Sequence, residues 1–526
     1  MKTEKCNVKE ISRQELVVKI NEHVNRILRQ NLYELKLDEH TANHLMQRKQ
    51  ELRDNLRRAG CGDLEAKKFL VQFIKESLMK LYGFTENTIE QTFLFLEKKS
   101  RKAEFCFDEI LYYLQKKYED NALEFFMEEN GLNPTVSGRY EIDETTICTL
   151  YKQYDIRLDF QDKLELLSRK VYAFYKGLGV IDEIRDMKID GVSGGVSGNR
   201  ENYANAWIFY KGQSVHLSFL DFESEAEMER ICRNMCRYRQ PGELSKKKGY
   251  LVHEMADHAR VVVARPDFAE CWLFFIRKLD NLPKSSLMDL LKDENRELPV
   301  TVLSWLMKGC QNVAITGMQG CGKTTLLMAL VEQIPREYTL RVLELAFELH
   351  LRERYQKRNI VTFRETANVD GFDALEVQKK TDGAVSIIGE VASAKVAAWM
   401  IESGQTGSLF SLFTHHAKTT ERLLYSLRNS LLKECNFHSE QIALSQVVEV
   451  VRFDVHLHMD RDGHRYIERI TEIIPMESGK GFRTVDLMYF DGEQYVQGAH
   501  ISMETRKDMA RQMTKKEREA FAHVDI

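Results

Sequence analysis

The residues best suited to chemistry lie in one short segment, residues 317–324, with the sequence GMQGCGKT. This segment fits the phosphate-loop pattern G-x-x-x-x-G-K-[ST] in full, and chance produces such a match in a chain of this length only about 2% of the time. The apolar run 313–315 leads into it, and the helix-forming run 325–330 follows. This context favours a phosphate loop over a glycine turn before an ordinary helix.

Each part of this loop has a physical task. Glycines let backbone N–H groups curl around the β- and γ-phosphates, at a helix N-terminus that already favours anions. Lys323 supplies a positive charge to those phosphates, and the Thr324 hydroxyl is suited to ligate Mg²⁺. ATP and Mg²⁺ are therefore the expected cofactors. The expected nucleotide-binding residues of the loop are Gly317, Gly320, Cys321, Gly322, Lys323, Thr324 and Thr325.

Two glutamates follow strand-like runs and are candidates for the acid that such a site needs. Glu390 comes after the hydrophobic run 384–388, and Glu344 comes after Arg341-Val342-Leu343. Parallel sheets place their ligands beyond the carboxyl ends of the strands, where both glutamates would lie. Glu390 is also a candidate for Mg²⁺ binding, most simply through water. The alternative for each is a solvated strand end without a catalytic role.

The elements that must position these groups begin at about residue 286. From there, buried strands alternate with helices, which is typical of an α/β domain with a mostly parallel sheet. Residues 286–475 are expected to form this domain and residues 476–526 a tail of strand and helix. The expected strands are 312–316, 340–345, 384–388 and 409–413, followed by strand-rich stretches at 447–458 and 465–474 with a turn at Asp462-Gly463.

The first half of the chain shows a different pattern. Residues 1–155 have apolar positions at three- and four-residue spacing and predict a helical extension without evident chemistry. Residues 160–282 predict a small α/β domain, with strands at 207–210 and 260–264 around a helix near 223–238. The glycine-rich stretch 191–198 predicts a mobile turn between strands rather than a phosphate loop, because no Lys-Ser/Thr pair follows it.

Composition narrows the class of protein. The chain has 526 residues, enough for about three domains, and a formal net charge of 76 − 80 = −4, without the basic excess usual for proteins that bind duplex DNA. No apolar stretch approaches the roughly 20 residues needed to span a bilayer, and the N-terminus carries no signal-peptide core. The ten cysteines are scattered, and no second pair joins Cys232 and Cys236 into a metal site. A cytoplasmic protein with free thiols is expected.

Together these features resemble the ATPase superfamily of type II and type IV secretion and pilus assembly, in particular the CpaF-type motors of tight-adherence (Flp) pili. Six segments in family order carry the resemblance. They are similar to the family's "G-L-G-P-I-E", "G-S-R-V", "T-I-R-K-F", "E-D-T-A-E-L", "G-E-V-R" and "T-G-H-x-G-S-L-x-T-x-H-A" boxes. In this chain they are 175–184 (YKGLGVIDEI), 258–261 (HARV), 275–279 (FIRKL), 344–349 (ELAFEL), 389–391 (GEV) and 406–417 (TGSLFSLFTHHA).

The resemblance implies roles for individual residues. Glu344 would activate the attacking water, Glu390 would act through the Mg²⁺ shell, and His416 would sense the γ-phosphate, with His415 the weaker choice. Arg260, Arg277 and Arg364 would contact phosphates, although each has a plain salt bridge as its alternative. An arginine placed this way stabilises charge on the transferring phosphoryl group.

The chain also departs from the family at several positions. Leu345 stands where the acidic box has Asp, Ala392 replaces the Arg of "G-E-V-R", and Ser408 replaces the first His of the histidine box. Nucleotide binding should survive because the loop is complete. Hydrolysis should be slow or differently regulated, because fewer polar groups support the two glutamates.

The resemblance implies a RecA-like ATPase domain preceded by a small PAS-like α/β domain. The function expected from it is a hexameric, Mg-ATP-hydrolysing motor at the inner face of the cell membrane, where it powers pilus assembly or secretion through an inner-membrane platform protein. A conjugative type IV secretion ATPase and a nucleotide-binding ring scaffold with little hydrolysis remain alternatives. A RecA-type nucleic-acid motor is disfavoured by the near-neutral charge and by the acidic and histidine boxes, so no direct nucleic-acid partner is expected.

Overall fold

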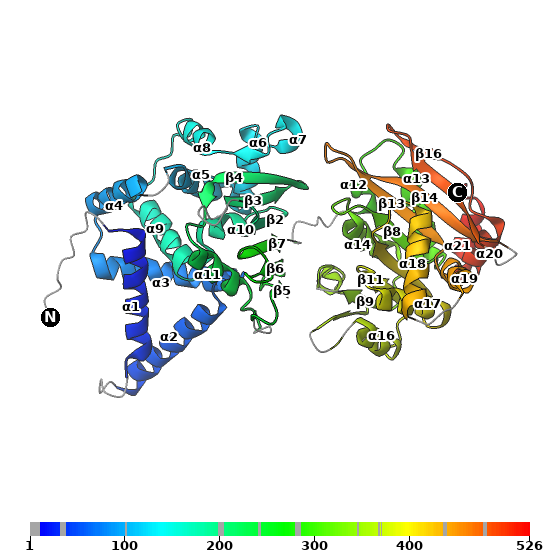
Figure 1. Cartoon of the computed structure of the whole chain (residues 1–526), viewed down its shortest axis with the longest axis horizontal. Helices are drawn as coiled ribbons and strands as arrows, with labels where there is room; N and C mark the ends of the chain where they lie inside the picture. Colours follow the sequence, from blue (N-terminus) through cyan, green and yellow to red (C-terminus); the bar gives the residue numbers. More distant parts are fainter. Residues whose placement is uncertain are drawn as a thin grey trace. The chain divides into compact units, whose positions relative to one another are not determined.

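The computed structural model divides the chain into two compact units, Met1–Asn281 (unit 1) and Leu282–Ile526 (unit 2). Figure 1 colours the chain by sequence, so that unit 1 runs from blue to green and unit 2 from green to red. The structure describes residues 11–31, 38–99, 102–197, 205–239, 244–278, 286–344, 347–366, 369, 371–434, 439–476 and 481–526.

Unit 1 begins with helices, as the periodicity of its sequence predicts. Side-chain caps start several of them; Ser12 and Asp159, for example, each form a capping box at the start of α1 and α9. The helices are α1 (Arg13–Arg29), α2 (Glu39–Arg58), α3 (Leu64–Tyr82), α4 (Glu86–Lys99), α5 (Lys102–Tyr118), α6 (Ala122–Glu129), α7 (Pro134–Ser137), α8 (Glu144–Tyr151), α9 (Phe160–Tyr175), α10 (Asp182–Asp186) and α11 (Glu225–Met235).

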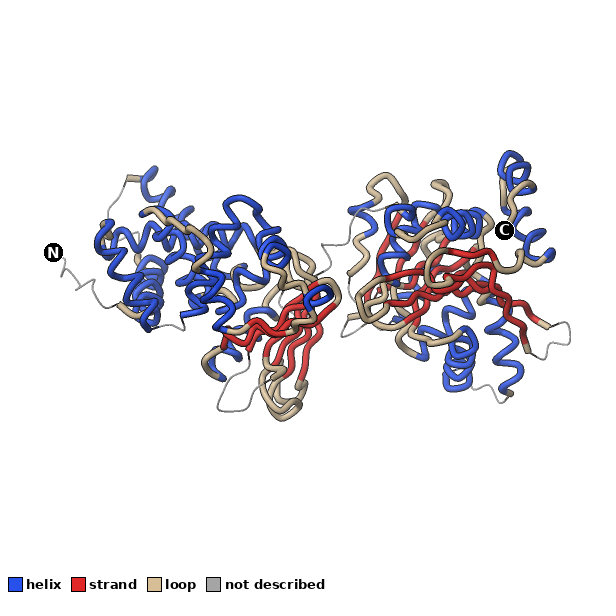
Figure 2. Tube along the Cα trace, turned by 90° about the horizontal axis from the view of Figure 1, so that it is seen from above, coloured by secondary structure: helices blue, strands red, loops and turns tan. Residues whose placement is uncertain are grey.

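A seven-stranded sheet completes unit 1, in the order β1-β4-β3-β2-β7-β6-β5. All described pairs are antiparallel except that of β1 with β4. Figure 2 shows most of the helices of this unit gathered on one side of the sheet. The strands are β1 (Glu141–Ile142), β2 (Gly191–Gly194), β3 (Asn205–Tyr210), β4 (Gln213–Asp221), β5 (Tyr250–Glu254), β6 (Arg260–Ala264) and β7 (Leu273–Arg277).

The glycine-rich stretch of unit 1 is a strand, so the expectation of a mobile turn is wrong for residues 191–194. These residues form β2, which is buried between β3 and β7. A Cβ on Gly191 would lie 2.2 Å from the carbonyl oxygen of Ile276, a distance that no larger residue tolerates. Gly191 therefore allows close packing of strands here. The frequency of glycine in turns led to the wrong prediction of a turn.

Helices and sheet share one core in unit 1. The cluster of buried side chains that includes Phe107 and Phe126, from α5 and α6, continues into Phe219 and Phe274 on the sheet. Phe107 packs edge-to-face on both Phe126 and Phe219. The helices from α5 onward thus cover the sheet that follows them, across the boundary expected near residues 155–160.

Unit 2 is built on a nine-stranded sheet, in the order β10-β9-β11-β12-β8-β13-β14-β15-β16. The first six strands in this order are parallel and the last three pairings are antiparallel. Helices cover both faces of the sheet (Figure 2). The expectation of an α/β protein with a mostly parallel sheet is confirmed in this unit.

The strands of unit 2 are β8 (Val313–Gly317), β9 (Leu340–Glu344), β10 (Ile360–Arg364), β11 (Val385–Ile388), β12 (Phe410–His415), β13 (Phe453–Met459), β14 (Arg465–Pro475), β15 (Phe482–Phe490) and β16 (Tyr495–Gln497). Its helices are α12 (Leu287–Leu290), α13 (Glu297–Lys308), α14 (Lys323–Gln333), α15 (Leu351–Arg354), α16 (Gly371–Lys379), α17 (Ala394–Thr406), α18 (Thr420–Glu434), α19 (Glu440–Val450), α20 (Met503–Gln512) and α21 (Lys515–Ala522). Among the described residues, no helix combines the length and apolarity that crossing a bilayer requires.

Two details differ from the expected elements. Residues 447–450 are the last turn of α19 rather than the start of a strand. Their valines pack against buried side chains of the helices that cover the sheet. Tertiary packing here overrides the strand preference of valine. The sheet also continues past residue 475 through β15 and β16, and Met509 and Phe521 from the final helices join the same core.

Candidate functional site

The phosphate loop joins β8 to α14 at the carboxyl edge of the parallel strands. Gly317, Gly320 and Gly322 all have positive φ angles, of +139°, +83° and +98°. A Cβ on Gly317 would meet the carbonyl oxygen of Leu457 at 2.4 Å. The loop therefore requires its glycines both for backbone conformation and for close packing against β13.

Lys323 is buried at the first turn of α14, and its ammonium group lies over the loop. Nζ donates hydrogen bonds to the carbonyl oxygens of Gly317, at 3.1 Å, and Met318, at 2.8 Å. It also lies 3.4 Å from Nδ1 of His416. The two carbonyl oxygens are neutral acceptors, which the more strongly accepting oxygens of a phosphate would replace.

His416 links this lysine to Glu390. Its Nε2 lies 3.3 Å from Oε1 of Glu390, with the histidine side chain half exposed. Lys323, His416 and Glu390 therefore form a row across the ends of β8, β12 and β11, as parallel strands permit. The neighbouring His415 instead bonds the carbonyl of Val391 and the hydroxyl of Ser426, and burial lowers its pKa.

Glu344 ends β9 as a buried carboxylate with a fixed orientation. Its Oε1 accepts hydrogen bonds from the backbone N–H groups of Glu348, at 2.9 Å, and Leu349, at 2.7 Å. With Glu390 and Glu365 it lines a small cavity, and Ala392 lines the same cavity. The described lining of this cavity thus contains three carboxylates and no lysine or arginine. Ala392, which stands where the resembled family has Arg, contributes no positive charge here.

The other two departures from the resembled family fall elsewhere. Ser408 precedes β12, at the edge of the sheet opposite the phosphate loop, where its hydroxyl bonds the carbonyl of Ser403. Its replacement of histidine therefore does not alter the carboxyl edge. Leu345 lies outside the described residues.

The three arginines expected at phosphates lie on strands. Arg364 ends β10 directly opposite Glu344 on β9, and its guanidinium stacks over the ring of Phe347 with 4.9 Å between them. Arg260 and Arg277 belong to unit 1, where they pair in register on β6 and β7. Contact of these arginines with phosphate stays a prediction.

Sequence reasoning missed a buried polar network behind the loop. The Thr316 hydroxyl lies 2.6 Å from Oδ1 of Asp454 and 2.8 Å from Nδ1 of His456, and the Thr420 hydroxyl donates to Oδ2 of Asp454 at 2.7 Å. All four side chains are buried. The network ties the residue before Gly317 to β13 and to the start of α18, and so fixes where the loop begins.

Burial dominates the protonation of this network. It raises the pKa of Asp454, against the hydrogen bonds from the two threonines. It lowers the pKa of His456 to about 4, with help from Arg469. A hydroxyl has one hydrogen, so Thr316 donates to one of these partners and accepts from the other. The sequence signal was the alternation Phe453-Asp454-Val455-His456, which indicates a strand but not that both of its faces are buried.

The donor set suits Mg²⁺. The Thr324 hydroxyl, on the first turn of α14, and the partly exposed Glu390 carboxylate are both hard oxygen donors at the loop. The positive φ angles of its glycines give the loop a backbone conformation typical of phosphate-binding loops, whose phosphates normally complete such a site. Thr324 and Glu390 would hold the ion, which when bound would offset negative charge on the phosphates.

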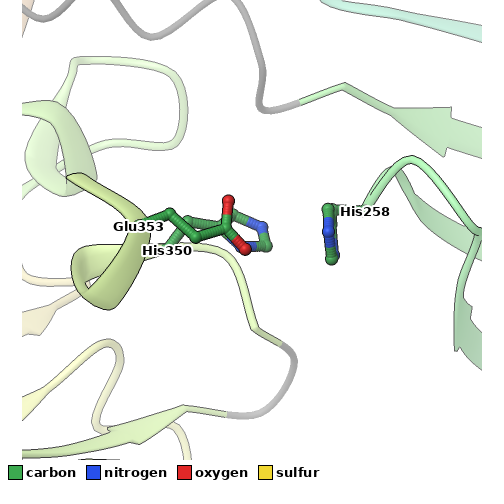
Figure 3. A group of neighbouring side chains, drawn as sticks. All are labelled: His258, His350 and Glu353. Carbon is green, nitrogen blue, oxygen red and sulfur yellow. The ribbon is translucent and has the colours of Figure 1, made fainter. Parts of the chain in front are cut away.

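Figure 3 draws three other side chains of metal-ligating type. His350 and Glu353 belong to unit 2, at the first turn of α15, with 3.9 Å between His350 Nδ1 and Glu353 Oε1. His258 belongs to unit 1, where its Nδ1 lies 2.7 Å from Oε1 of Glu254. Each is a feature of its own unit.

Comparison with known proteins agrees with this site. Residues 268–460 match the family model described as "Type II/IV secretion system protein", and the match spans the phosphate loop, Glu344, Glu390 and His416. No curated protein matches the sequence. Residues 268–460 are thus similar to the secretion-system ATPases, which hydrolyse ATP, so the prediction of an ATPase is confirmed.

Several solved structures are similar to part of this chain. They include the VirB11 ATPase of the Brucella suis type IV secretion system (19% identity, 54% of this chain and 89% of that chain, TM-score 0.30), the Legionella pneumophila ATPase DotB (14%, 55% and 78%, 0.40) and the pilus retraction motor PilT (13%, 65% and 88%, 0.38). At these identities and TM-scores the likeness adds no argument of its own.

Proposed function

We propose that this protein is an Mg-ATP-hydrolysing motor that powers pilus assembly or protein secretion, as a CpaF-type ATPase does. The observation that carries the proposal is the row formed by Lys323, His416 and Glu390 at the mouth of a complete phosphate loop. Glu344 lies in a cavity that Glu390 shares. A site built only to bind nucleotide would not need two carboxylates on this side of the loop.

The proposed reaction is in-line attack of water on the γ-phosphate. Glu344 takes the water's proton, because its carboxylate is oriented by two backbone amides. Lys323 moves from the loop carbonyls to the phosphates and stabilises the charge of the transition state. His416, between Lys323 and Glu390, senses whether the γ-phosphate is present.

Several parts of the proposal rest on family likeness rather than on this site. The family forms hexameric rings, and we propose a hexamer for this chain too. We propose a cytoplasmic position at the inner face of the cell membrane, with an inner-membrane platform protein as partner. The helical extension of residues 1–155 would then dock or regulate the motor.

Two alternatives differ in measurable ways. A conjugative type IV secretion ATPase would share this site and would be distinguished by the genes beside its own. A ring scaffold with little hydrolysis is favoured by the cavity at Ala392, whose described lining brings only negative charge to Glu344 and Glu390.

Steady-state Mg-ATPase activity of the purified chain, alone and with added DNA, tests the proposal. Wild-type turnover should rise with protein concentration and not with DNA, and Lys323→Ala and Glu390→Gln should both abolish it. Glu449→Gln, an exposed glutamate of α19, is the matched control and should retain wild-type turnover. Tight ATP binding without turnover, unchanged by Glu390→Gln, would contradict the motor and support the nucleotide-binding scaffold.

A further inference from the structure

Arg465 begins β14, and its guanidinium rests on the phosphate loop. Its Nε donates a hydrogen bond to the carbonyl oxygen of Gly320 at 2.8 Å. The hairpin of β13 and β14 follows the loop closely, since Cβ atoms built on Gly320 and Gly322 would lie 3.7 Å from Met459 Cε and 3.8 Å from Arg465 Cδ. Both the aliphatic part of the Arg465 side chain and its guanidinium group therefore lie against the loop.

Only one of the five N–H donors of this guanidinium bonds to the loop. Within the described part of the chain, the two terminal nitrogens of Arg465 make no hydrogen bond or ion pair. Four donors in a planar fork thus remain beside a loop whose backbone is shaped for anions. This fork matches the oxygens of a phosphate group.

The electrostatic setting of Arg465 also calls for an anion. The loop leads into the N-terminus of α14, where the helix dipole disfavours positive charge. Arg465 adds a second cation near Lys323, whose contacts with the loop are to neutral carbonyls and His416. A bound phosphate chain offsets both charges at once.

Strand order decides which phosphate Arg465 reaches. Glu344, Glu390 and His416 follow β9, β11 and β12, which all lie on one side of β8 in the sheet. Arg465 comes from β14, two strands away from β8 on the opposite side. The γ-phosphate must lie near the carboxylates that activate water, so the opposite side of the loop corresponds to the α- and β-phosphates.

We propose that Arg465 is a nucleotide-binding residue that contacts the α- or β-phosphate and contributes equally to the binding of ADP and ATP. The proposal rests on the proposed nucleotide site and adds a ligand that the phosphate-loop motif does not contain. Arg465 takes no part in activating water.

The test is direct binding of ADP and ATP to the full chain by calorimetry, together with ATPase kinetics. Arg465→Gln keeps one donor for the Gly320 carbonyl but removes the charge and the fork, so the Kd for both nucleotides should rise about tenfold. KM should rise similarly while kcat changes less than twofold. The matched control is Arg461→Gln, an exposed arginine in the turn of the same hairpin, which should bind both nucleotides as wild type does.

Other outcomes separate this inference from the function beneath it. Wild-type affinity in Arg465→Gln, with binding lost in Lys323→Ala, would reduce Arg465 to a structural contact with the loop. A loss for ATP alone, with a fall in kcat, would place it at the γ-phosphate and overturn the assignment. If the wild-type chain binds neither nucleotide, the proposed nucleotide site, and with it the proposed function, is wrong. Arg465→Lys, which keeps the charge without the fork, should have intermediate affinity and guards against a variant that fails to fold.

Discussion

Buried charges have different contacts around Lys67 in unit 1 and at the phosphate loop of unit 2. In unit 1, Lys67 Nζ lies within 2.7 to 2.9 Å of Asp182, Glu183 and Asp186, and all four are largely buried. Burial opposes the ionisation of Asp186, but Lys67 and Arg185 outweigh it and lower its pKa to about 2. Charges of unit 1 neutralise one another across α3 and α10.

At the nucleotide site of unit 2, neutral groups contact the buried charges. Lys323 donates to backbone carbonyls, Glu344 accepts from backbone amides, and Asp454 accepts from the hydroxyls of Thr316 and Thr420. Neutral partners orient a charged group while leaving its field for a ligand. The comparison indicates that the ion pairs around Lys67 stabilise the packing of helices. The oriented charges at the phosphate loop are instead suited to bind and act on a ligand.

The largest expected effect on stability follows from removing Lys67. Lys67→Met removes the cation that three buried acidic side chains share, so unit 1 should lose about 3 to 5 kcal/mol of unfolding free energy. Lys68→Met, at an exposed pair with Glu65, should lose less than about 0.5 kcal/mol. Hydrogen exchange read separately in each unit checks this; protection lost in unit 2 instead would contradict the comparison.

Glu344 tests the opposite case, a charge kept for chemistry. Glu344→Gln retains an oxygen that accepts from the amides of Glu348 and Leu349, so folding should be unaffected. Turnover should fall about 100-fold or more, because the base is lost. Single-turnover ATP hydrolysis measures this, with Glu332→Gln on the exposed side of α14 as control. Equal turnover in the two variants would exclude Glu344 as the base.

Acid should weaken unit 2 before unit 1. The pKa of His456 is about 4 in the folded chain and about 6.5 when unfolded, so the unfolded state takes up a proton first as pH falls below 6.5. This difference at His456 should therefore take about 2 kcal/mol from the unfolding free energy of unit 2 between pH 7 and pH 5, while the raised pKa of Asp454 acts in the opposite direction.

In unit 1 the same change of pH acts differently. The contribution of Asp186, whose pKa is about 2, is lost only as pH falls from about 4 toward 2. Burial raises the pKa of Asp108 to about 6, which makes unit 1 gain stability as pH falls from 6 toward 4. Denaturant unfolding of each unit at pH 7 and pH 5 measures both, and His456→Gln should remove the unit 2 slope. Earlier loss in unit 1 would refute this order.

The smallest effect concerns the network behind the loop. Thr316→Val removes one hydroxyl that serves Asp454 and His456 and should cost about 1.5 kcal/mol. Thr316→Ser keeps the hydroxyl and should cost clearly less. Thermal unfolding of unit 2 compares the two variants, and equal losses would show that the methyl group matters rather than the hydrogen bonds.

Local rules predicted much of unit 2 but less of unit 1. The phosphate loop, the parallel strands and the glutamates after them follow from short patterns, because each depends on neighbours in the chain. The strand at Gly191 and the helix end at Val450 did not, because packing against distant strands decided both. The ion pairs of Lys67 could not be predicted for the same reason, because its partners lie over a hundred residues away in the sequence.

The sequence by itself determined that a nucleotide site exists, because the conformation of a glycine-rich loop and the dipole of the helix after it are local properties. Tertiary structure decided which side chains meet there. His416 rather than His415 reaches Lys323, and strand pairing brings Arg465 and Asp454 to the loop and the residue before it. Strand order joins residues more than a hundred positions apart, and no local spacing encodes that order.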